Sequence, residues 1–132
     1  MVSDPNVESI AARVAMEHER SLGREVRSVE TENCGYDLLS TQPRPTESGA
    51  YLNARFIEVR ERGTSGEVAL TSSEFGTAQR LGNDYRLYVV FDCTTIPTLR
   101  RLQNPAKLEW QRVVKVEHYC VSTQTILEAT GG

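Results

Sequence analysis

The segment at residues 86–92 constrains the fold most, because the side chains at positions 87–91 are all apolar and leave no polar face. Such a run is typical of a strand that other elements cover on both sides. It is far shorter than the roughly 20 apolar residues that a membrane helix needs. We therefore predict a central buried strand here and no membrane span.

Two segments have the periodicity of helices. In residues 7–22, apolar side chains recur every three or four positions, and Gly23 follows where a helix commonly ends. Residues 71–74 read Thr-Ser-Ser-Glu, the pattern of a capping box, and predict a helix that runs to about Leu81. Gly82 and Asn83 then close this second helix.

The remaining patterns predict strands and turns. Strands are expected at residues 35–40, 51–60 and 67–71, the last two as a hairpin, with a short extended piece at 26–29 and a loop at 41–50. A helical segment is expected at 99–102 after Pro97, residues 110–121 are a candidate late strand, and residues 122–132 are expected to fray. The order of helix, three strands, helix and strand predicts one α/β or α+β domain, a mixed sheet flanked by helices, in this chain of 132 residues.

Charge and cysteine content narrow the classes of protein. The formal net charge is −3, which argues against a strongly basic clamp for nucleic acid, although local patches are compatible with it. Cys34, Cys93 and Cys120 form no CxxC pair, so free thiols in a reducing, cytoplasmic compartment are expected, and no secretory signal is predicted at the start. His18 and His118 stand alone, without the spacing of a zinc site.

Four side chains form the candidate site. Glu58 and Arg60 are two positions apart on a predicted strand, so they share one face, and Asp37 belongs to the preceding strand. Glu19 lies near the end of the first helix. Carboxylates that converge on a sheet edge suit Mg²⁺ or Mn²⁺, and a cation beside them could stabilise charge on a phosphate. The alternative is a solvent-facing strand with an ion pair worth less than about 1 kcal/mol.

Arginines on the predicted surface are a second, weaker signal. Scattered arginines usually only solvate a surface, but some of these could contact phosphates. Arg100 and Arg101 beside Lys107 form the best small basic cluster, and the other candidates are Arg55, Arg62, Arg80 and Arg86.

Several blocks, in order over residues 10–108, resemble the NO VEIN C-terminal domain family: AMEHERSLGREV (15–26), GYDLLS (35–40), RFIEVR (55–60), LTSSEF (70–75), LGNDYRLYVV (81–90) and LQNPA (102–106). That family resembles the PD-(D/E)xK nuclease superfamily, which has the restriction-endonuclease-like fold. The resemblance implies metal-dependent cleavage of nucleic acid, DNA rather than RNA. Its members resemble modules attached to helicases or to phage-defence proteins, and a homodimer stays open.

The resemblance also implies roles for single residues. Asp37 matches the first acidic position, Glu58 matches the acidic residue of the (D/E)xK half-motif, and Glu19 matches the helix glutamate that completes the metal ligands. Arg60 stands where the family has lysine, and because arginine stays protonated it cannot act as a base. Two alternatives follow, a catalytically decayed fold that binds nucleic acid and a module that binds a partner protein.

Overall fold

The computed structural model describes residues 4–43, 53–63, 67–113 and 119–131. Its helices are α1 (Pro5–Ser21), α2 (Ser72–Leu81) and α3 (Thr123–Ala129). Its strands are β1 (Glu25–Ser28), β2 (Leu38–Thr41), β3 (Arg55–Arg62), β4 (Tyr85–Phe91) and β5 (Thr98–Gln103). Three short 3₁₀ turns join them: η1 (Glu30–Glu32), η2 (Gly82–Asp84) and η3 (Pro105–Lys107).

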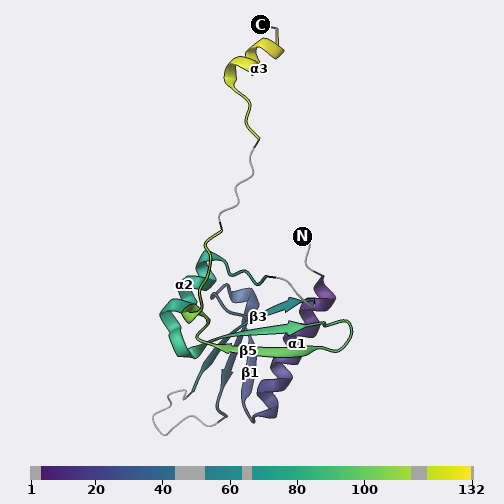
Figure 1. Ribbon diagram of the computed structural model, residues 1–132, viewed down its shortest axis with the longest axis vertical. Coiled ribbons are helices and arrows are strands. Elements are labelled where there is room, and N and C mark those ends of the chain that lie inside the picture. Colours follow the sequence, from purple (N-terminus) through teal and green to yellow (C-terminus); the bar gives the residue numbers. More distant parts are fainter. Residues whose placement is uncertain (1–3, 44–52, 64–66, 114–118, 132) are drawn as a thin grey trace.

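The strands of the described residues form one mixed sheet in the order β1-β2-β3-β4-β5. Neighbouring strands are antiparallel except for β3 and β4, which are parallel because α2 carries the chain back between them. Figure 1 shows α1 and α2 flanking this sheet. The predicted α+β class, a mixed sheet flanked by helices, is confirmed.

The hydrophobic core lies between α1 and one face of the sheet. Ala11 and Ala15 are fully buried on α1, and their small side chains let the helix approach the strands closely. The strands contribute Ile57, Val59 and Tyr88 to this face. The helix predicted at 7–22 is thus confirmed.

The central strand is also confirmed. β4 is buried at Leu87 and Tyr88, whose side chains point to opposite faces of the sheet. Its second face lies toward α2, where Thr77 and Ala78 are buried. A capping box at Thr71 and Glu74 starts α2, as the sequence predicts.

The hairpin predicted for residues 67–71 is wrong, because no strand forms there. Both edges of β3 are already paired, one with β2 and the other with β4. Side chains hold this segment instead: Arg60 Nε donates to the carbonyl of Ala69 at 3.3 Å, and Arg62 Nε donates to that of Glu67 at 2.6 Å.

The short helix predicted at 99–102 is also wrong, because this segment is β5, antiparallel to β4. Leu99 and Leu102 are three positions apart, which suits one turn of a helix. The segment instead forms a strand on the free edge of β4, because this pairing provides a complete ladder of backbone hydrogen bonds.

The remaining boundaries differ modestly from the predicted ones. β1, β2 and β3 lie close to the predicted extended segments, although positions 44–52, which include most of the predicted loop, are outside the described residues. No strand forms at 110–113 or 119–121, and positions 114–118 are not described. Residues 123–129 form α3, with exposed side chains, where no element was predicted. None of the described helices is long and apolar enough to cross a bilayer.

Candidate functional site

Asp37 lies where the pairing of β2 with β3 ends. Leu38 is the first residue of β2 and is paired with Ile57, while the backbone N–H of Asp37 still donates to the carbonyl of Ile57 at 2.8 Å. Beyond this point the Asp37 side chain replaces the backbone ladder, and its Oδ2 accepts from the N–H of Val59 at 2.9 Å. The carboxylate is therefore fixed against β3.

Glu58 meets Asp37 on the face of the sheet that is turned away from α1. Its side chain is 1 % exposed, and the Asp37 carboxylate is near enough to interact with it electrostatically. Burial, together with the contact and charge of Asp37, raises the pKa of Glu58 to about 9, although Arg60 opposes the shift. Glu58 Oε2 is buried without a donor among the described groups. A proton on Glu58 would satisfy the pair, because it turns one carboxyl into a donor.

Arg60 bridges two carboxylates. Its guanidinium donates to Glu58 Oε1 at 2.5 Å and to Glu74 Oε1 at 2.6 Å. Burial lowers the pKa of Arg60, but the two carboxylates outweigh burial and raise it. Glu74 Oε1 also accepts from the N–H of Thr71 at 2.9 Å, so the capping box of α2 orients the partner of Arg60.

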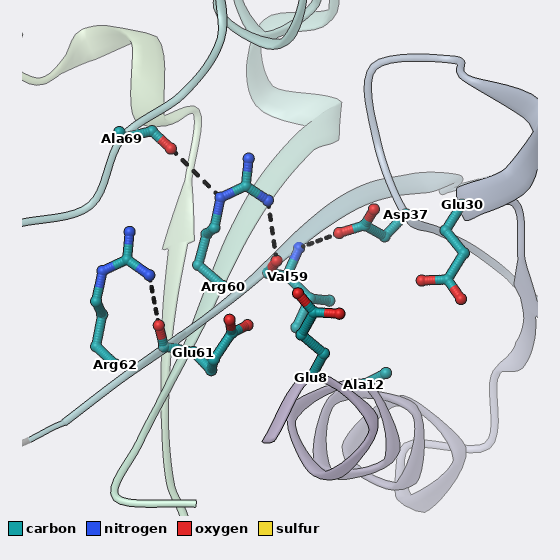
Figure 2. A pocket seen from close by; sticks show the side chains of 9 residues that line it. All are labelled: Glu8, Ala12, Glu30, Asp37, Val59, Arg60, Glu61, Arg62 and Ala69. Atoms are coloured by element: carbon teal, nitrogen blue, oxygen red, sulfur yellow. Dashed lines mark hydrogen bonds between the residues drawn. The ribbon is translucent and has the colours of Figure 1, made fainter. Parts of the chain in front are cut away.

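A pocket of about 460 Å³ opens beside Asp37, between the first half of α1 and the end of β3. Figure 2 shows Asp37 and Glu30 on one side of it, Arg60 and Arg62 of β3 on the other, and Glu8 and Glu61 between them. The ionisable side chains that line it are Glu8, Glu30, Asp37, Arg60, Glu61 and Arg62. Acidic groups outnumber basic ones, so the pocket attracts cations.

Glu19 does not join this site, because it lies on the opposite face of the sheet. Its carboxylate is fully buried and accepts from the Tyr88 hydroxyl at 2.8 Å and from Arg55 at 3.1 Å. Arg24 Nε lies 3.6 Å from Glu19 Oε1. Tyr88 pairs with Val59, and both side chains face α1. Glu58 directly precedes Val59 on β3, so its side chain points to the opposite face of the sheet.

The structure thus places Asp37, Glu58 and Arg60 in one region and leaves Glu19 on the opposite face of the sheet. The sequence analysis missed Glu74 as a partner of Arg60, although the capping box had already placed that glutamate at the start of a helix. It also missed Glu8, Glu30 and Glu61, which carry no motif and reach the pocket only through the fold.

The chemistry of the pair suits a hard divalent cation. Asp37 and Glu58 offer carboxylate oxygens, and Glu58 Oε2 is a buried acceptor without a donor among the described residues. Mg²⁺ keeps several water ligands and is often held by one or two carboxylates. In the described part of the chain no three histidine, cysteine or acidic side chains lie close enough to share an ion. Two carboxylates are therefore the protein ligands that this site can supply.

Comparisons with known proteins give one match. No curated protein and no solved structure matches the chain. The family model described as Protein NO VEIN, C-terminal, matches residues 7–102, which covers α1 through most of β5 and well over half of the chain. The chain therefore belongs to the NO VEIN C-terminal family.

Proposed function

We propose that this domain acts on nucleic acid by metal-dependent hydrolysis of phosphodiester bonds, with Asp37 and Glu58 as ligands of Mg²⁺ or Mn²⁺. The observation that supports this most is that the Asp37 carboxylate, which lines an acidic pocket, also acts electrostatically on the buried carboxylate of Glu58. The order of helix, three strands, helix and strand is compatible with a PD-(D/E)xK fold. The free thiols of Cys34, Cys93 and Cys120 suit a reducing, cytoplasmic location.

Each protein group has a definite task in this proposal. Asp37 is held by the Val59 N–H and presents its carboxylate to the pocket. Glu58 gives up its proton when the cation enters, because a ligating carboxylate must be ionised. Arg60 stays protonated and offsets negative charge, so it cannot take the proton of an attacking water. A bound Mg²⁺ would polarise the phosphate and acidify a water.

Cleavage of plasmid, single-stranded DNA and RNA in Mg²⁺ and in Mn²⁺ tests this proposal. Asp37→Ala should reduce cleavage to background, since it removes one of two protein ligands. Glu17→Ala, an exposed change on α1, is the matched control and should cleave like the wild type. Cleavage that persists in Asp37→Ala would come from a contaminant and would sink the proposal.

A second candidate function, binding without cleavage, is favoured by the environment of Arg60. Both ends of its guanidinium are held by Glu58 and Glu74, so a phosphate would have to displace a carboxylate to reach it. In this version the domain is a catalytically decayed module that binds nucleic acid, or a partner such as a helicase. Arg60→Lys distinguishes the two candidates, because it should create cleavage only where the lysine alone was lost. Binding to DNA that is insensitive to salt would exclude phosphate contacts.

A further inference from the structure

Arginines from distant parts of the chain gather near the end of α1, on the face of the sheet opposite Glu58. Arg24 follows α1, and Arg55, Arg86 and Arg101 come from β3, β4 and β5. Arg101 is paired with Tyr88, whose side chain faces α1, so Arg101 shares that face. Arg86 and Arg55 lie on it as well, by the alternation of their strands. We call these four residues the arginine cluster.

The positive charges of the arginine cluster are close enough to act on one another electrostatically. Burial, and next the charge of Arg55, lower the pKa values of Arg24 and Arg86. Burial and then the charge of Arg101 likewise lower the pKa of His18 on α1. Four guanidinium groups are therefore concentrated in one region of a chain whose net charge is −3.

Two carboxylates offset part of this charge. Glu19 is buried beneath the cluster and binds Arg55, and Asp84 acts on Arg86. Among these six groups the positive charges outnumber the negative ones by two. Glu19 is fully buried, so its negative charge is balanced by the guanidinium groups beside it.

The four arginines differ in how much of each guanidinium group is exposed and in how many hydrogen bonds it already donates within the protein. Arg24 is only 7 % exposed and donates to Ser40 and to the carbonyl of Asn53, so it mainly holds the fold together. Arg55 is 22 % exposed and donates to both oxygens of Glu19. Arg86 is half-buried and donates from Nε to the carbonyl of Asn83, while Arg101 is exposed. The outer part of the cluster is thus the part that a ligand can reach.

The arrangement has room for a ligand. A pocket of about 440 Å³ lies beside the inner arginines and is lined by Leu22, Gly23, Arg24, Gln42, Pro43 and Arg55. Across the sheet, from β3 to β5, the cluster spans two strand spacings, about 10 Å, and the register offsets its members along the strands as well. That distance exceeds the size of one phosphate group, so several phosphates in a row fit it better than a single anion does.

We propose that the arginine cluster binds the phosphodiester backbone of a nucleic-acid strand, as an anchoring surface separate from Asp37 and Glu58. Guanidinium groups match phosphate oxygens with paired hydrogen bonds and remain charged at every physiological pH. The surface lies on the opposite face of the sheet from the carboxylate pair. The arginine cluster and the site of the proposed function have only the class of ligand, nucleic acid, in common. Binding at the cluster needs no divalent cation.

Binding of a short fluorescein-labelled single-stranded DNA, measured by anisotropy in EDTA, tests the proposal apart from cleavage. Arg101→Glu is the test variant and Arg100→Glu is its matched control, because the two neighbours on β5 are both exposed and point to opposite faces. Arg101→Glu should weaken binding several-fold more than Arg100→Glu. It should also shrink the loss of affinity between about 50 and 200 mM salt by about threefold for each phosphate contact removed.

Three outcomes would overturn the proposal. The first is a wild-type protein that does not bind the DNA at about 50 mM salt. The second is an equal loss of affinity in Arg100→Glu and Arg101→Glu, which would indicate only general charge. The third is displacement of the DNA by inorganic phosphate at matched ionic strength, which would indicate a site for a single phosphate group. Circular dichroism of both variants checks that they are folded.

Discussion

Glu19 and Glu58 are both buried glutamates, and their surroundings are opposite. Glu19 faces donors, the hydroxyl of Tyr88 and the guanidinium of Arg55, so its negative charge is matched on the spot. Glu58 faces another carboxylate, Asp37, and shares Arg60 with Glu74. Burial alone therefore does not identify a functional carboxylate. The one whose charge is not fully matched by its neighbours has capacity for a cation.

The largest expected difference between the two glutamates is in stability. Glu19→Gln should lower the free energy of unfolding by about 3 kcal/mol, because it leaves buried guanidinium groups without their counter-charge. Glu17→Gln, on the exposed side of the same helix, should change it little. Urea unfolding followed by circular dichroism measures both. A loss in Glu19→Gln no larger than that in the control would contradict the structural role of Glu19.

The second difference is in the dependence of stability on pH. The pKa of Glu58 rises from its usual 4.5 to about 9, so between these values the folded protein binds a proton that the unfolded chain releases. The free energy of unfolding should therefore fall as the pH rises from 6 to about 7.5, by an amount on the order of 2 kcal/mol, and should keep falling up to about pH 9.

Glu58→Gln tests the origin of this slope. Glutamine cannot ionise, so the variant should lose most of the decline, whereas Glu19→Gln should keep it. Urea titrations at several pH values in EDTA give the comparison. An unchanged slope in Glu58→Gln would mean that Glu58 is already ionised at pH 6, and the contact with Asp37 would then need another explanation.

The smallest expected effect concerns how Glu74 is positioned. Thr71→Ala removes the side-chain acceptor of the capping box and should lower the free energy of unfolding by about 1 kcal/mol. Ser72→Ala, at the next position and equally exposed, is the matched control. Equal stability of the two variants would mean that the cap contributes little to orienting Glu74 toward Arg60.

The sequence predicts the buried elements of this fold better than its edges. α1 and β4 have unambiguous periodicity, and the capping box marks the start of α2. Residues 67–71 and 99–102 were misread because their structure depends on which strand edges are free, and no local pattern reports that. β4 takes one edge of β3 and leaves its own other edge for β5.

The candidate site shows the same division. The positions of Glu58 and Arg60 on one face follow from the period of a strand, and Asp37 follows from the strand before it. The place of Glu19 depends on the side of the sheet that α1 covers, which spacing along the chain does not determine. The gathering of Arg55, Arg86 and Arg101 likewise depends on the order of the strands.

Binding of Mn²⁺, measured by calorimetry near pH 7 in two buffers of different ionisation enthalpy, tests the central claim most directly. If Asp37 and Glu58 share a proton at a cation site, the wild type should release about one proton for each ion bound. Asp37→Asn should abolish this binding, and Tyr88→Phe, which disturbs only the surroundings of Glu19, should retain it. Binding without proton release, or equal loss in the two variants, would contradict the account.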